Sequence, residues 1–156
     1  MINFVDRDWH YDEEDAKVVL KPWGREVWIN FYKDENIGDI QKKYIMKKLY
    51  INKGTRTSFQ YHKKKIETNF LIKGSVEAWF ENKEGHIDIK LLKSGSIWSI
   101  PALTKHRIVT LEDVILIESS TPEVDDVIRI IFFLYIYYIN NILMLHWQYF
   151  CSFIIF

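Results

Sequence analysis

Short runs in which apolar and polar side chains alternate fill the chain from residue 44 to residue 118, separated by turns rich in Gly, Asn and Lys. Alternation places apolar side chains on one face of a strand, as at Val76, Ala78 and Phe80. No long stretch has a helical period. The pattern predicts an antiparallel β-sandwich or barrel, with strands at 28–32, 44–51, 58–62, 69–72, 76–81, 87–91, 97–100, 107–111 and 114–118.

The boundaries of this β-rich region follow from local composition. Residues 1–19 are acidic and polar and predict an N-terminal arm. Pro22 and Gly24 then break any helix and predict a turn. A polar loop is expected at 33–39, and a single β-domain at 20–130. The length of 156 residues is enough for one domain with a real core.

One charged residue lies on an otherwise apolar strand face. If Ile45, Leu49 and Ile51 face the core, alternation makes Lys47 face it too. A buried lysine is costly unless an anion or a solvated cavity receives it. Two interpretations remain open: a shifted register with Lys47 at a barrel rim, or a contact to phosphate or substrate.

Charge and cysteine content narrow the classes of partner and compartment. Lys plus Arg and Asp plus Glu balance at 21 each, so no nucleic-acid or anionic-membrane partner is expected. The single cysteine, Cys151, forms no internal disulfide. Asp6, Arg7 and Asp8 interrupt any apolar start, so we expect no signal peptide and a cytoplasmic location.

Residues 131–156 contain no charged side chain, whereas all charged residues precede Ile131. This hydrophobic tail is long enough to cross a bilayer, so a membrane partner is expected only if the tail is native. Against a membrane span, no basic residue flanks its start after Arg129, and polar side chains interrupt it: Asn140, Asn141, His146 and Gln148. A second interpretation is that it packs on the barrel as strands or a helix. The favoured one is a frameshifted or foreign end, because AT-rich DNA encodes such residues in an unintended frame.

Four polar residues form a candidate metal site: Gln60, His62, Glu67 and His106. Gln60 and His62 project to the same side of a strand. Glu67 starts the next apolar run and His106 follows a much later turn, so the four converge only if the sheet closes on itself. Imidazole, carboxylate and amide groups together hold zinc, manganese, iron or nickel. The alternative is a polar core without metal.

The residues around this set carry a resemblance to a known family. The pattern G-x5-Q-x-H-x4-E-x6-G, from Gly54 to Gly74, and G-x5-P-x4-H, from Gly95 to His106, resembles the two cupin motifs. The Gln-x-His pair is similar to the cupin domain of mannose-6-phosphate isomerases, especially the one that ends the bifunctional mannose-6-phosphate isomerase/mannose-1-phosphate guanylyltransferases. Three flanking stretches match in the same order and extend the resemblance over about residues 20–130: 21–26, 44–52 and 123–129.

The resemblance implies a fold and an activity. It implies an all-β, single cupin barrel (double-stranded β-helix or jelly-roll) with a hydrophobic C-terminal tail, in a protein that forms homodimers. The implied reaction interconverts mannose 6-phosphate and fructose 6-phosphate on a divalent metal, zinc first, with manganese, iron, cobalt or nickel as alternatives. The metal polarises substrate oxygens while a base moves a proton between adjacent carbons. The metal ligands would be Gln60, His62, Glu67 and His106.

Three cationic residues, Lys47, Lys65 and Arg129, are candidates for phosphate binding or proton transfer. Lys65 stands where the isomerases typically carry an arginine, and the family's acidic continuation after Arg129 is missing. The alternative role for Arg129 is a surface ion pair with Asp125 or Asp126.

These departures favour an alternative function, a non-catalytic cupin module that binds a sugar or a metal ion. An iron-dependent dioxygenase is a third interpretation, which Gln60 in place of histidine disfavours.

Overall fold

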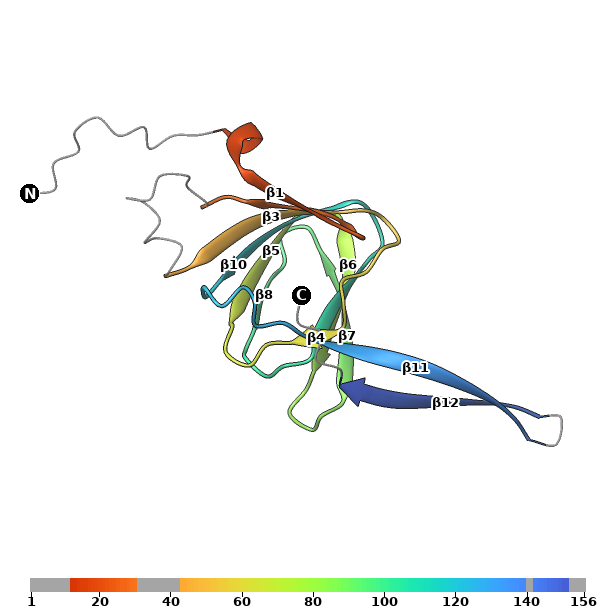
Figure 1. Ribbon diagram of the computed structural model, residues 1–156. Helices are drawn as coiled ribbons and strands as arrows, with labels where there is room; N and C mark the ends of the chain where they lie inside the picture. The colour runs from red at the N-terminus through yellow and green to blue at the C-terminus, as the bar shows by residue number, and fades with distance from the viewer. Residues whose placement is uncertain (1–11, 31–42, 140–141, 152–156) are drawn as a thin grey trace, which may run out of the picture.

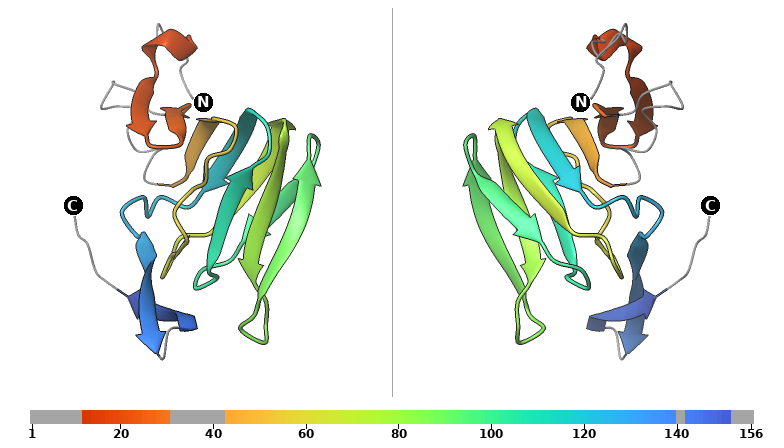
Figure 2. Two further views of the ribbon diagram at one scale, coloured as in Figure 1. Left: turned by 90° about the vertical axis from the view of Figure 1, so that its right-hand side faces the viewer. Right: turned by 90° about the vertical axis from the view of Figure 1, so that its left-hand side faces the viewer.

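Two antiparallel sheets facing one another make up the computed structural model, which describes residues 12–30, 43–139 and 142–151 (Figure 1). Most of the expected N-terminal arm and the expected loop at 33–39 lie outside these residues. A 3-10 turn at Glu13–Asp15 precedes the first strand. The side views show the two layers and, apart from them, the hairpin of β11 and β12 (Figure 2).

The first sheet has the strand order β1-β2-β3-β10-β5-β8. Its strands are β1 (Lys17–Lys21), β2 (Gly24–Trp28), β3 (Ile45–Ile51), β10 (Val114–Ser120), β5 (Glu67–Lys73) and β8 (Ile97–Ile100).

The second sheet has the strand order β12-β11-β4-β9-β6-β7. Its strands are β12 (Ile142–Cys151), β11 (Ile128–Ile139), β4 (Gln60–Tyr61), β9 (His106–Thr110), β6 (Ser75–Glu81) and β7 (Ile87–Lys93). Strands distant in sequence therefore lie side by side in both sheets, which is the arrangement of a jelly-roll.

The core lies between the sheets, because the alternating apolar positions of both face inward. Leu49, Leu71 and Leu116 of the first sheet belong to one buried cluster with Val76 and Ala78 of the second. Full burial of one such large side chain is worth about 2 kcal/mol. The predicted alternation along β6 is confirmed, since Val76 and Ala78 are fully buried.

The strand predicted at 97–100 is found with those ends, and the other expected strands are found with shifted ends, except the first. Gly24–Trp28 is the strand in place of the predicted 28–32, of which residues 31 and 32 lie outside the described residues. The turn at Pro22 and Trp23 joins this strand as a hairpin to β1. Gly24 has a φ of +145°, and a Cβ there would lie 2.0 Å from the Tyr50 carbonyl oxygen. The segment predicted at 58–62 pairs as a strand only at Gln60–Tyr61.

Lys47 faces the barrel interior, as alternation predicts, and only 6% of it is exposed. It lies in a cross-strand row between Trp28 of β2 and Glu118 of β10. The register is therefore not shifted, and the interior of this half of the barrel is charged.

The predicted tail begins inside β11. This strand pairs with β4 only at Ile128 and Arg129, and beyond that its partner in the described part of the chain is β12. The hairpin of β11 and β12 extends away from the barrel (Figure 1). Among the described residues, no helix is long and apolar enough to span a membrane.

Candidate metal centre

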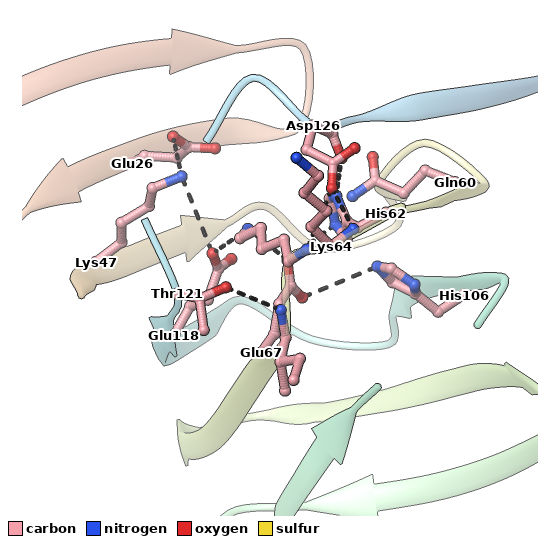
Figure 3. Close-up of polar contacts among 12 residues, drawn as sticks. Glu26, Lys47, Gln60, His62, Lys64, Glu67, His106, Glu118, Thr121 and Asp126 are labelled. Carbon is pink, nitrogen blue, oxygen red and sulfur yellow. Dashed lines mark hydrogen bonds and ion pairs between the residues drawn. The ribbon is translucent and has the colours of Figure 1, made fainter. Parts of the chain in front are cut away.

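Three of the predicted ligands meet at one end of the barrel (Figure 3): His62, Glu67 and His106. One ligand atom from each lies within 4.8 Å of the others. Nε2 of His62 is 3.1 Å from Oε1 of Glu67, and Nε2 of His106 is 3.9 Å from Oε2. All three side chains are buried, which is the setting of a built site rather than of surface charges.

The ligands come from both sheets. Glu67 opens β5 of the first sheet, whereas His106 opens β9 of the second, opposite Gln60 of β4. His62 follows β4 directly, and its main-chain oxygen accepts a hydrogen bond from the nitrogen of Leu103 at 2.6 Å. The convergence therefore depends on closure of the two sheets into a barrel, as the spacing predicts.

Hydrogen bonds to the outer ring nitrogens orient both imidazoles. Nδ1 of His62 contacts the main-chain oxygen of Asp126, and Nδ1 of His106 contacts that of Thr104 at 2.9 Å. Because a carbonyl only accepts, each Nδ1 carries a proton, which leaves each Nε2 as the ring atom that can bind a metal. Both Nε2 atoms are buried without a hydrogen-bond partner of suitable geometry, which is how imidazoles that bind a metal are held.

Gln60 lies beside this trio but is less tightly placed. It is half-buried and lines the same cavity, and its Oε1 accepts a hydrogen bond from Ser58. A carboxylate and two imidazoles, with an amide side chain lining the same cavity, fit a divalent ion without thiolate ligands. The ligand role of Gln60 stays a prediction.

Charges around Glu67 keep it ionised. Burial opposes its charge, but the contact with His62 and the positive charge of Lys65 outweigh burial and hold the pKa of Glu67 far below its usual value. Burial is the main cause that lowers the pKa of His106, so this imidazole is neutral at pH 7. Both residues are therefore in the protonation state that binds a metal.

Lys65 is the predicted cation closest to the ligands. Its Nζ lies 2.5 Å from Oε1 of Glu67 and 2.9 Å from Oε1 of Glu118. Burial would lower the pKa of Lys65, but the charges of Glu118 and Glu67 outweigh it and raise this pKa above its ordinary value. Lys65 therefore stays charged and donates hydrogen bonds to both carboxylates, so it does not act as a base.

Lys47 extends this cluster of charges from Glu118 to β2. Its Nζ lies 3.4 Å from Oε2 of Glu26 and 3.9 Å from Oε1 of Glu118. Oε1 of Glu26 is in turn 3.4 Å from Nζ of Lys21. Internal carboxylates are therefore the anions that receive Lys47, and a line of alternating charges runs from Glu67 to Lys21.

Arg129, the third predicted cation, lies at the exposed rim of the cavity, opposite Gln60 in the β4–β11 pairing. Within the described residues it has no ion pair with Asp125 or Asp126. The Asp126 carboxylate instead accepts hydrogen bonds from the main-chain nitrogens of Lys64 and Lys65. The role of Arg129 toward a phosphate stays a prediction.

Sequence reasoning missed the acidic partners Glu26 and Glu118 and the contacts of Asp126. A signal for Glu118 existed, because it shares a strand face with the apolar residues Val114 and Leu116. Two opposite charges at core-facing positions, Lys47 and Glu118, indicate an internal pair. No signal predicts that the main chain of Asp126 meets His62.

Fold and site together define a class: an all-β cupin-type jelly-roll with a candidate site for a divalent metal ion. No protein-family model matches the sequence, and no curated protein matches it significantly. Solved structures do match.

The matching structures include several of oxalate decarboxylase from Bacillus subtilis. One, a substituted form, has a TM-score of 0.60 at 18% identity and covers 71% of this chain and 28% of that one. A deletion mutant has a TM-score of 0.64 at 16% identity and covers 76% of this chain and 31% of that one. A third structure, from a study of that enzyme's Mn(II) centres, has a TM-score of 0.60 at 17% identity and covers 71% of this chain and 28% of that one.

The chain thus spans less than a third of the length of each matched enzyme. These likenesses confirm the cupin fold, while the similarity to mannose-6-phosphate isomerases stays a prediction.

Proposed function

We propose that this chain is a metal-dependent sugar-phosphate isomerase that interconverts mannose 6-phosphate and fructose 6-phosphate. One observation carries the proposal: His62, Glu67 and His106 converge with inward-facing ligand atoms on a cavity that Gln60 and Arg129 also line. The cavity is open and has a volume of about 1660 Å³, which leaves room for a hexose phosphate.

Each predicted residue has a part in this reaction. A divalent ion, zinc first among the candidates, would polarise the carbonyl and the neighbouring hydroxyl oxygen of the open-chain sugar. The guanidinium of Arg129, at the rim, matches the oxygens of a phosphate group. Lys65 would donate a hydrogen bond or a proton beside Glu67, because its raised pKa keeps it charged. Lys47 lines the same cavity and is paired there with Glu26 and Glu118.

The test is a coupled assay for fructose 6-phosphate formed from mannose 6-phosphate, with the full chain and added zinc, manganese or cobalt. We expect activity that requires metal and is lost in His62→Ala. His86→Ala is the matched control, because His86 is an exposed histidine outside the cavity. Absence of turnover while one metal ion binds per chain would reject the isomerase.

A second candidate is a non-catalytic module that binds a metal ion or a sugar. The observation in its favour is that Lys65 and Lys47 already contact carboxylates, so neither is free for a phosphate group. Binding of mannose 6-phosphate, measured by calorimetry, without conversion by the metal-loaded protein would support this function.

A further inference from the structure

Residues 121–130, which we call the strap, run antiparallel to residues 59–66, the segment that carries His62. At one end, the nitrogen of Thr121 donates to the oxygen of Ile66, and the nitrogen of Ile66 to Oγ1 of Thr121, both at 3.1 Å. At the other end, Ile128 and Arg129 pair with β4, and the nitrogen of Ile130 donates to the oxygen of Phe59 at 2.8 Å. The strap is therefore fastened on both sides of His62.

Between these ends, Asp126 holds the ligand segment through two different groups (Figure 3). Its Oδ2 accepts hydrogen bonds from the nitrogens of Lys64 and Lys65, at 2.5 and 3.1 Å. Its main-chain oxygen accepts a hydrogen bond from Nδ1 of His62. One residue of the strap thus fixes both the turn after His62 and the ring of His62.

Both contacts affect atoms on which metal binding depends: the ring of His62 and the turn that follows it. The carbonyl keeps a proton of His62 on Nδ1, so Nε2, which faces Glu67, is the atom left to bind the metal. The carboxylate fixes the turn that separates His62 from Glu67 and thereby sets the position of the second ligand relative to the first. Without these bonds, the metal would have to select one tautomer and one turn conformation from several, which lowers its affinity.

We propose that Asp126 is a positioning residue for the metal ligand His62, and that ordering of the strap and binding of the metal are coupled. The inference rests on the metal centre of the proposed function but not on its sugar substrate. By reciprocity, the coupling that makes the strap favour the metal makes the metal favour the strap.

The experiment measures zinc affinity of the full-length, metal-free protein by competition with a chromophoric chelator. Asp126→Ala is expected to weaken zinc binding by about 10- to 100-fold, the usual effect of losing a residue that orients a metal ligand. Asp125→Ala is the matched control, since it removes the same charge from the adjacent, exposed position of the strap. We expect its zinc affinity to equal that of the unchanged protein.

Two further readouts separate positioning from general stability. In ¹⁵N NMR of the metal-free protein, Nδ1 of His62 is expected to carry a proton, and this preference is expected to weaken in Asp126→Ala. Zinc is expected to slow hydrogen exchange of the Lys64 and Lys65 amides in the unchanged protein, and to do so less in the variant. A purely structural role would change the unfolding midpoint but not the tautomer.

Zinc affinity unchanged in folded Asp126→Ala would overturn the inference. If that variant does not fold, the pair Asp126→Asn and Asp125→Asn decides, because a neutral amide oxygen accepts weaker hydrogen bonds from the Lys64 and Lys65 nitrogens than a carboxylate does: equal zinc affinities overturn the proposal, and weaker binding by Asp126→Asn supports it. Failure of the unchanged protein to bind zinc, manganese or cobalt would overturn the metal centre and this inference together. Failure of isomerisation alone, with metal bound, would leave the inference standing.

Discussion

His106 and Glu67 are buried groups whose pKa values lie below their ordinary values of 6.5 and 4.5, and Lys65 is a buried group whose pKa lies above 10.5. In each case the folded and unfolded chains bind protons differently, so stability depends on pH. The direction of each shift fixes the side of the pH range on which the protein loses stability.

Acid is expected to destabilise the metal-free protein as the pH falls below about 6.5. The unfolded chain then takes up a proton at His106 that the folded chain resists, and below about 4.5 the same applies to Glu67. At the alkaline end, the contribution of Lys65 is lost as the pH rises above about 10.5. Urea unfolding across this range measures the effect; equal stability at pH 7.5 and pH 5.5 would contradict it.

Among single residues, the sequence predicts the candidate metal ligands better than it predicts the residues that orient them. His62, Glu67 and His106 were predictable, because their residue types and their places at strand ends follow from alternation and turns. The contacts of Asp126 were not, since a main-chain oxygen has the same chemistry at every position and only the path of the strap brings this one to His62.

Strand β3 separates two kinds of ion pair on its two faces. Lys47 contacts Glu26 and Glu118 inside the barrel, whereas Lys48, on the outer face, contacts Glu13 at 2.7 Å. Removing one member of a buried pair leaves a charge without its counter-ion, but a surface pair contributes little. Adjacent residues of one strand therefore provide a matched comparison.

We expect Lys47→Met to lower the free energy of unfolding by about 3 kcal/mol. Lys48→Met is the control and is expected to cost less than about 1 kcal/mol, because Glu13 remains partly exposed to water. Denaturant unfolding of both variants is the measurement. Similar losses in the two variants would show that burial of the Lys47 charge has no energetic consequence.

The hairpin of β1 and β2 depends on Gly24. A side chain there would meet the Tyr50 carbonyl oxygen of the neighbouring strand at 2.0 Å, in a backbone conformation with positive φ. We expect Gly24→Ala to cost about 3 kcal/mol of stability. Gly85→Ala also has a positive φ but meets nothing within 4 Å, so its cost is about 1 kcal/mol. Thermal unfolding midpoints in the opposite order would contradict this explanation.

Most strands were predictable from alternation, and the errors have physical causes. The segment 28–32 is apolar enough for a strand, but the close approach of Gly24 to β3 places the pairing earlier. The segment 58–62 has strand composition, yet its hydrogen bonds beyond Gln60–Tyr61 go to the strap and to Leu103 instead of a continuous neighbour. Strand ends depend on such partners, which a local pattern does not contain.

At the scale of the whole molecule, the main-chain pairing of β11 with the barrel, within the described residues, is confined to Ile128, Arg129 and Ile130. Pairing with β4 ends at Arg129, and the last main-chain bond to the barrel in the described residues is that of Ile130 to Phe59. Whether residues 131–156 are native, foreign or membrane-directed stays a prediction of sequence alone.

A chain ending at residue 130 is expected to keep the metal affinity and the unfolding midpoint of the full chain. The reason is that the strap and every candidate ligand lie before that point. Zinc titration and thermal unfolding of the two forms are the measurements. A truncated form that fails to fold would show that β11 and β12 support the barrel beyond the pairing at Ile128 and Arg129.

The position at which the strap ends also bears on where substitutions and fused domains leave the barrel intact. The last charged residue of the sequence, Arg129, coincides with the last strand pair that fastens the strap. Substitutions after this point are therefore expected to disturb the barrel less than substitutions before it. The same position is a natural junction for fusing another domain, which would leave the metal-ligand segment on the opposite side of the strap undisturbed.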